Sequence, residues 1–156
     1  MSNILQGDID GSDRKVGIIV SEFNEAISTN LLSGTLNALN DCNVNEKNIF
    51  IVKVPGAFEI PLIALQLAKK KEYDVLICLG AVIRGETGHY DFVASGSALG
   101  ISKVSLDTGI PVIFGILTTD NLQQAIDRSG GKYGNKGYDC GITAIKMSSI
   151  NSKLLK

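Results

Sequence analysis

The chain's only histidine, His89, ends the segment Arg84–His89, which reads RGETGH and follows an apolar run. An imidazole exchanges protons near neutral pH, so a histidine that a substrate can reach is suited to proton transfer. Gly85 and Gly88 would let a ligand approach the backbone, and Thr87 would cap the next helix, whose free amides attract anions. The segment therefore indicates an anion site beside a proton-transfer group. The alternatives are an ordinary capped turn and a core histidine that backbone groups satisfy.

The sequence does not support other familiar reaction centres. Neither GETGH nor the later stretch GGKYGNKG is a P-loop, because both lack the GK[ST] ending, and no GxSxG motif marks a serine nucleophile. The three cysteines, Cys42, Cys78 and Cys140, are far apart, so neither a disulfide framework nor a zinc site is indicated. One histidine without clustered cysteines also gives little basis for a transition metal, and the isolated cysteines suit a reducing cytoplasm.

Three further side chains could contact a ligand. Phe23, in the stretch SEFNE, could stack on a planar ring or simply cover the edge of the core. Glu59 follows a Pro-Gly turn, where its carboxylate could bind the hydroxyls of a polyol or stabilise the start of a helix. Arg128 could form paired hydrogen bonds to a phosphate, although an isolated arginine is more often a surface charge.

The elements that must hold these groups alternate along the chain. Nearly continuous apolar runs indicate buried parallel strands, and amphipathic stretches between them indicate helices. We expect strands at 15–21, 48–54, 74–82 and 110–118. We expect helices at 25–41, 58–70, 90–106 and 122–129, and a last helix through the C-terminus. This order predicts an α/β fold, a three-layer α/β/α sandwich with a four-stranded parallel sheet.

In such sheets, ligands bind beyond the carboxyl ends of the strands. Each expected strand ends in an unusual cluster of residues, and the four clusters read SEFNE, PGAFE, AVIRGETGH and FGILTTD. Because parallel strands bring these clusters to one edge of the sheet, the sequence predicts a binding site at that edge.

Composition and charge narrow the class of partner. The 156 residues are 44% hydrophobic and carry a net charge of −1 with dispersed Lys and Arg, so one sizeable core is expected and a nucleic-acid partner is not. The apolar runs stay under about ten residues, too short to span a membrane. Residues 1–13 are polar and have no secretion signal, so we expect an N-terminal arm before a single domain at 14–156.

Six motifs occur in order from about Lys15 into the C-terminal helix. They are SEFN at 21–24, PGAFEIP at 55–61, GAVIRGETGHYDFV at 80–93, PVIFGILTT at 111–119, QQAIDRSG at 123–130 and GNKG at 134–137. With these motifs the chain resembles the 6,7-dimethyl-8-ribityllumazine synthase family. Enzymes of this family condense 5-amino-6-(D-ribitylamino)uracil with 3,4-dihydroxy-2-butanone 4-phosphate, releasing phosphate and water, in the penultimate step of riboflavin biosynthesis. The resemblance implies that this protein is a transferase that does the same without a cofactor.

The resemblance also implies roles for individual residues. Phe23 would stack on the pyrimidinedione, Glu59 would hold the ribityl hydroxyls, and His89 would transfer protons. The residues that would line this pocket are Asn24, Ala57, Phe58, Ala81, Val82 and Ile83. Glu86 and Thr87 would bind the phosphate of the butanone, largely through the backbone and the Thr87 hydroxyl, with Arg128 closing on it. The residues that would come from an adjacent subunit are Phe114, Arg128, Lys132 and Lys136.

Family members assemble as pentamers, and many form icosahedral shells of twelve pentamers. The connector 128–135 is short here, as in shell-forming members, which favours the shell, and the arm at 1–13 would pair with a neighbouring subunit. Riboflavin synthase, the following enzyme, is a candidate partner. Gln123 and Lys146 depart from the usual family pattern, but both lie outside the expected pocket.

Other functions fit the same fold. A non-catalytic module could hold a flavin or lumazine through Phe23 and Glu59, and a structural shell protein could have lost its activity. The presence of Thr87, His89 and Arg128 together counts against both. An unrelated enzyme on this frame is excluded only by the set of motifs, because a fold does not fix a function. The motifs assign no role to Arg84, for which a structural ion pair is one candidate.

Overall fold

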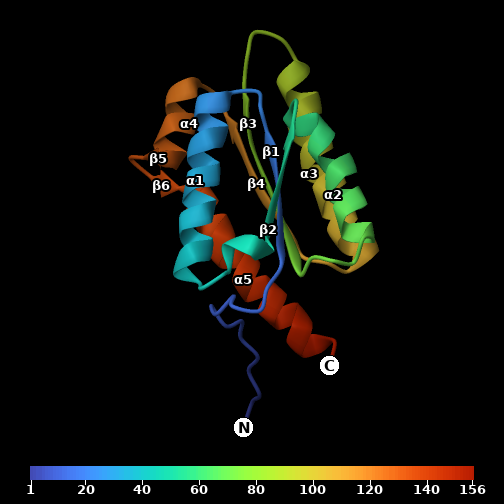
Figure 1. The fold of residues 1–156 in the computed structure, drawn as a ribbon. Helices are drawn as coiled ribbons and strands as arrows, with labels where there is room; N and C mark the ends of the chain where they lie inside the picture. The colour runs from blue at the N-terminus through green and yellow to red at the C-terminus, as the bar shows by residue number, and fades with distance from the viewer.

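A computed structural model describes the whole chain, residues 1–156, and Figure 1 shows its fold. Four parallel strands form one sheet in the order β2–β1–β3–β4. Their bounds are β1 (Val16–Ser21), β2 (Ile49–Val54), β3 (Val75–Ile83) and β4 (Val112–Thr119). The predicted four-stranded parallel sheet is therefore confirmed.

Helices cover both faces of the sheet, as the predicted three-layer sandwich requires (Figure 1). One face carries α1 (Glu25–Asp41), α4 (Leu122–Arg128) and α5 (Lys136–Leu154). The other face carries α2 (Ile60–Lys69) and α3 (His89–Thr108). Two buried apolar clusters fill the spaces between these layers, one on each face. None of the helices is long and apolar enough to cross a membrane.

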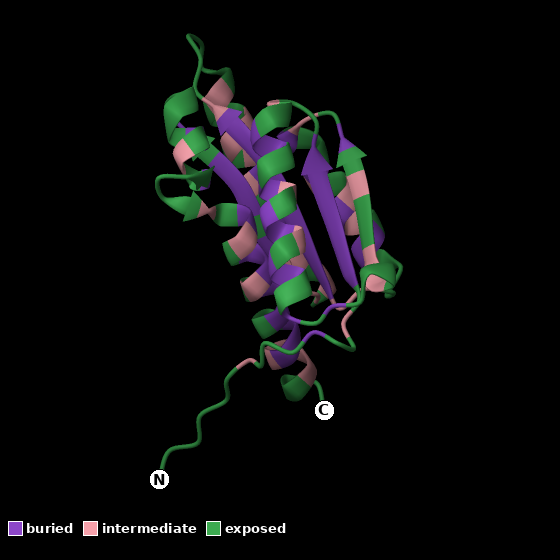
Figure 2. Ribbon diagram, turned by 60° about the vertical axis from the view of Figure 1, so that its left-hand side comes forward, coloured by how far each residue is buried: buried purple, intermediate pink, exposed green.

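The burial of each strand follows from its place in the sheet. The inner strands β1 and β3 are buried almost throughout, and Figure 2 shows them as the purple centre of the molecule. Such strands face helices on both sides, which explains their continuous runs of apolar residues. The strands β2 and β4 lie at the edges and bury fewer of their residues.

The structure adds short elements that the sequence pattern did not predict. Single turns of 3-10 helix, η1 (Glu46–Asn48) and η2 (Ala57–Glu59), precede β2 and α2. The expected glycine-rich connector contains a small antiparallel hairpin of β5 (Ser129–Gly131) and β6 (Gly134–Asn135). Gly130 and Gly134 have φ angles of 106° and 83°, a left-handed conformation that glycine adopts without strain.

Residues 1–10 form no helix or strand, and Figures 1 and 2 show them leading away from the sheet. Part of this segment contacts α5. The amide of Asp8 donates to Ser149 Oγ at 3.0 Å, and Lys153 Nζ lies 3.1 Å from Asp8 Oδ2. Lys153 Nζ also donates to the carbonyl of Gln6 at 2.9 Å. Pairing of the arm at 1–13 with a neighbouring subunit stays a prediction, as does its separation from a domain at 14–156.

All three cysteines are free thiols in the core, and this burial gives a first testable prediction. Burial raises the pKa of Cys42, Cys78 and Cys140, to about 11 for Cys140. A raised pKa lowers the fraction of thiolate, the reactive form, at about pH 8. We expect almost no reaction of the native protein with a chromogenic disulfide reagent, and three reactive thiols per chain after unfolding in urea. Fast labelling of the folded chain would contradict this burial.

Candidate functional site

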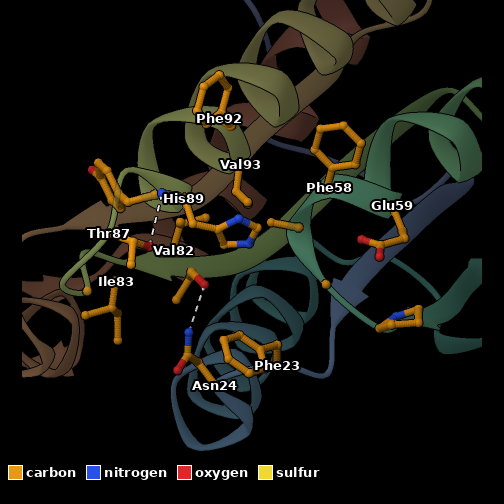
Figure 3. A pocket seen from close by; sticks show the side chains of 16 residues that line it. Phe23, Asn24, Phe58, Glu59, Val82, Ile83, Thr87, His89, Phe92 and Val93 are labelled. Carbon is orange, nitrogen blue, oxygen red and sulfur yellow. Dashed lines mark hydrogen bonds between the residues drawn. The ribbon is translucent and has the colours of Figure 1, made fainter.

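A cleft of about 760 Å³ opens at the carboxyl edge of the sheet, where β1, β2 and β3 end. Figure 3 shows its side chains converging from the loops after β1 and β2, from the end of β3 and from the start of α3. Its lining residues are Phe23, Asn24, Pro55, Gly56, Ala57, Phe58, Glu59, Ala81, Val82, Ile83, Gly85, Thr87, His89, Tyr90, Phe92 and Val93. Most of the residues expected in a binding site thus surround one cleft.

Five expected site residues do not line the cleft of their own chain: Glu86, Phe114, Arg128, Lys132 and Lys136. Glu86 is an exposed part of the loop after β3. Phe114 lies on β4, and Lys136 begins α5. Arg128 ends α4 and Lys132 lies between β5 and β6, and their side-chain cations lie 5.1 Å and 5.4 Å from the centroid of the exposed Tyr133 ring. Neither of these two cations forms an ion pair.

The turn after β1 fixes Phe23 and Asn24 through backbone and amide hydrogen bonds. The amide of Phe23 donates to the carbonyl of Pro55 at 3.0 Å, and Asn24 Nδ2 donates to the carbonyl of Ala81 at 3.0 Å. Asn24 itself has a φ of 58°, a left-handed conformation that asparagine tolerates better than most residues. These contacts leave the Phe23 ring 71% exposed at the mouth of the cleft, where it can stack on a planar ligand.

The turn after β2 presents Phe58 and Glu59. The amide of Glu59 donates to the carbonyl of Gly56 at 3.2 Å, which closes the single turn η2. The Phe58 ring is 62% exposed and rests against Gly96 of α3, where an added Cβ would lie 2.8 Å from Phe58 Cε1. Glu59 is exposed and forms no ion pair, so its carboxylate oxygens are free to accept hydrogen bonds from a ligand.

The loop from Gly85 to Gly88 leads from β3 into α3. Gly88 is the N-cap of this helix and makes no side-chain cap, so the expected cap by Thr87 is only partly correct. Thr87 lies one residue earlier, and its hydroxyl accepts from the amide of His89 at 3.4 Å (Figure 3). The helix begins one residue before the expected Tyr90, which makes His89 its first residue. The amide of Asp91 donates to the carbonyl of Gly88 at 3.1 Å, so the amides of Gly88 and Tyr90 are the ones at this helix start without an acceptor in the chain.

His89 is exposed, and its imidazole lies inside the cleft among the labelled side chains of Figure 3. The alternative of a core histidine is therefore wrong. No side-chain hydrogen bond or ion pair within the chain occupies the imidazole nitrogens, so both remain available to exchange protons with a bound molecule. A reachable histidine in this position fits the requirements of general acid–base catalysis.

The first turn of α3 adds apolar side chains that the sequence reasoning missed. Phe92 and Val93 follow His89 by three and four residues and lie on the same face of the helix, beside the cleft. In the stretch HYDFV these two residues stand at the i+3 and i+4 positions from His89. This helical spacing would have placed them beside His89 if the helix had been predicted to begin there. Pro55, Gly56 and Tyr90 also line the cleft without having been predicted.

Arg84, to which the sequence assigned no role, forms two ion pairs. Its Nε lies 3.2 Å from Asp120 Oδ1, and its Nη1 lies 3.5 Å from Asp91 Oδ1. The hydrogen bond that Arg84 Nε donates to Asp120 raises the pKa of the guanidinium above its ordinary value, so Arg84 is charged at every working pH. Gln123 and Lys146 do not line the cleft.

Comparison with protein families agrees with this arrangement. The family model for 6,7-dimethyl-8-ribityllumazine synthase matches residues 13–152 of the 156-residue chain. The match covers every element of the sheet, both helical layers and the whole cleft. The chain therefore belongs to the 6,7-dimethyl-8-ribityllumazine synthase family, transferases that form lumazine from small molecules in riboflavin biosynthesis and assemble as homo-oligomers.

Proposed function

We propose that this protein condenses 5-amino-6-(D-ribitylamino)uracil with 3,4-dihydroxy-2-butanone 4-phosphate. The products are 6,7-dimethyl-8-ribityllumazine, inorganic phosphate and water. The observation that carries this proposal is the position of His89. The only histidine of the chain is the exposed first residue of α3, it lines the cleft together with Phe23 and Thr87, and its imidazole has no partner in the chain. A proton-transfer group between an anion site and a stacking site is what this condensation requires.

The loop before α3 supplies the phosphate site. A Cβ added at Gly85 or Gly88 would meet no atom of the chain within 4 Å, and neither residue has a left-handed φ. Neither packing nor backbone conformation therefore requires glycine at these positions. Close approach of a ligand does explain them, because it would bring a phosphate onto the unpaired amides of Gly88 and Tyr90 and onto the Thr87 hydroxyl. Glu86 would contribute through its backbone amide, since its carboxylate would repel the phosphate.

The other end of the cleft fits the pyrimidine substrate. The Phe23 ring would stack on the pyrimidinedione, and Asn24, Val82 and Ile83 would enclose its edge. Ala57, Phe58 and Ala81 complete this part of the lining. Glu59 lies beyond Phe58, where its free carboxylate can accept hydrogen bonds from the ribityl hydroxyls. This arrangement assigns the planar ring and the polyol chain of one molecule to two different groups of the cleft.

His89 would move the protons of the condensation. The 5-amino group attacks the ketone carbonyl, and the resulting carbinolamine loses water to give an imine. Removal of a proton from the carbon beside the imine and departure of phosphate from the next carbon leave an enol, which tautomerises to a new ketone. The ribitylamino nitrogen attacks this ketone, and loss of another water closes the new ring. Each step transfers a proton to or from nitrogen, oxygen or carbon, and holding both substrates together supplies much of the remaining acceleration. The substrates provide their own reactivity, so the proposal assigns no step to a metal or cofactor.

A second copy of the chain would complete the site. Phe114, Arg128, Lys132 and Lys136 do not line the cleft of their own chain, and Arg128 and Lys132 have no ion-pair partner. In a homo-oligomer these residues can face the cleft of the neighbour, where the two free cations would bind the phosphate bidentately and by charge. We infer a pentamer, with the twelve-pentamer shell and the capture of riboflavin synthase as further expectations. A cytoplasmic location likewise stays an expectation.

A binding module without activity is the second candidate. The exposed Phe23 and the free Glu59 would suffice to hold a flavin or a lumazine. This function would leave the glycines of the Gly85–Gly88 loop and the position of His89 unexplained, so the condensation accounts for more of the structure. An inactive shell protein would leave the same features without a role.

Inorganic phosphate offers a direct test of the proposed site. Phosphate is expected to inhibit lumazine formation in competition with the phosphorylated ketone but not with the pyrimidine, because only the ketone occupies the helix start. The inhibition patterns follow from initial rates measured while each substrate is varied in turn, with mass spectrometry to identify the product. Competition with the pyrimidine, or no inhibition at high phosphate, would contradict an anion site at Thr87.

A further inference from the structure

Arg84 lies at the junction of three segments. It follows the last residue of β3, and Ile83 pairs with Thr119 across β3 and β4. This register places Arg84 opposite Asp120, and the amide of Arg84 donates to the carbonyl of Thr119 at 2.9 Å. The Nε–Asp120 and Nη1–Asp91 contacts then join the end of β4 to the first turn of α3.

These contacts enclose the loop from Gly85 to Gly88. Arg84 precedes the loop and Asp91 follows it, so their ion pair links the two ends of the segment. The guanidinium also lies over the ring of Tyr90, 4.2 Å from its centroid. Tyr90 is the residue after His89, so this stacking acts on the same helical turn that carries the imidazole.

The loop itself has few internal restraints. Added Cβ atoms at its two glycines would touch nothing within 4 Å, and the Thr87 hydroxyl makes one long hydrogen bond of 3.4 Å. Arg84 does not line the cleft, so it has no direct contact with a molecule bound there. Any effect of Arg84 on ligand binding must therefore pass through the loop and the start of α3.

We propose that Arg84 is a positioning residue that holds the loop Gly85–Gly88 and the first turn of α3 in the geometry required to bind phosphate and to aim His89. This role rests on the proposed function. It requires arginine rather than lysine, because a planar fork reaches two carboxylates and stacks on a ring, whereas an ammonium provides one point charge. A single exposed ion pair contributes little to stability. Here, however, one arginine side chain makes two ion pairs and stacks on a ring, so three contacts act together.

The test compares Arg84→Lys with the wild type and with a matched control. Arg84→Lys is expected to raise KM for the phosphorylated ketone roughly 10-fold and to lower kcat, the scale of a slightly displaced site, while KM for the pyrimidine changes less than about 2-fold. Asp120→Asn is expected to shift KM and kcat in the same direction. The double variant is expected to lose less transition-state stabilisation than the two single variants together, because both remove the same contact. Lys103→Gln breaks the exposed Lys103–Asp107 pair of 2.8 Å elsewhere on α3 and is expected to change neither KM.

Hydrogen–deuterium exchange gives a readout that does not depend on turnover. Amides of residues 85–91 are expected to exchange faster in Arg84→Lys than in the wild type, at unchanged thermal stability, and not in Lys103→Gln. Unchanged exchange and unchanged KM values in Arg84→Lys would overturn the positioning role, as would equal increases in both KM values. A wild type that forms no lumazine would contradict the proposed function alone, because the exchange experiment still decides whether Arg84 holds the loop.

Discussion

Replacing His89 with alanine is expected to slow turnover by about 10- to 10⁴-fold, the usual contribution of general acid–base catalysis, while the pyrimidine still binds. His89 is the one histidine among the residues that line the cleft, and histidine is the usual general acid–base residue of enzymes. It lies at the start of α3, beside the loop that we assign to the phosphate. Residual activity is expected, because the remaining side chains would still hold both substrates together.

The measurement for His89→Ala is the steady-state rate of lumazine formation with both substrates saturating. Binding of the pyrimidine is measured separately, by calorimetry, to show that the cleft is intact. His89→Gln serves as the control, since glutamine keeps hydrogen-bonding capacity but does not titrate. An alanine variant as fast as the wild type would remove His89 from the mechanism, and a variant that also loses the pyrimidine would point to a binding role instead.

Replacing Arg128 with alanine is expected to raise KM for the phosphorylated ketone about 10- to 100-fold, the cost of losing charge-assisted hydrogen bonds. The KM for the pyrimidine is expected to stay nearly constant. Arg128 is exposed at the end of α4 and forms no ion pair within its own chain, so its removal leaves no buried charge unpaired. Equal losses for both substrates, measured by initial rates, would contradict the phosphate role.

Mixing the two variants tests whether sites are shared between subunits. In a shared site, one chain provides His89 and its neighbour provides Arg128. Such a site is intact where an Arg128→Ala chain, which keeps His89, lies next to a His89→Ala chain, which keeps Arg128. Co-refolding His89→Ala with Arg128→Ala in equal amounts is therefore expected to restore about a quarter of the sites, because each of the two required residues is present in about half of the chains. The same variants refolded separately and then combined serve as the control. No gain on co-refolding would place both residues in the site of one chain.

The main elements of the fold could be read from the sequence because each has a simple physical signature. The runs that became β1 and β3 are apolar at nearly every position, since helices cover both faces of these strands. The β5–β6 hairpin could not be predicted in the same way. Its strands contain three and two residues, and its shape depends on left-handed glycines rather than on a hydrophobic pattern.

Site residues in the loops that follow the strands could be predicted from the sequence. Site residues on a helix were harder to predict. Phe23, Glu59 and Thr87 follow the carboxyl ends of β1, β2 and β3, so the topology alone brings them together. Phe92 and Val93 were missed because their place depends on the exact register of α3. The role of Arg84 depends on the pairing of β3 with β4, which places Asp120 beside it and cannot be derived from a local pattern.

The central claim is tested most directly by following both products of one reaction. Purified protein is mixed with the pyrimidine and the phosphorylated ketone, with no metal or cofactor added, while the lumazine absorbance and the released phosphate are recorded together. We expect equal molar amounts of lumazine and phosphate, formed well above the spontaneous rate and abolished when either substrate is omitted. No rate above background, with the pyrimidine still bound, would contradict it and would identify a binding module in place of a synthase.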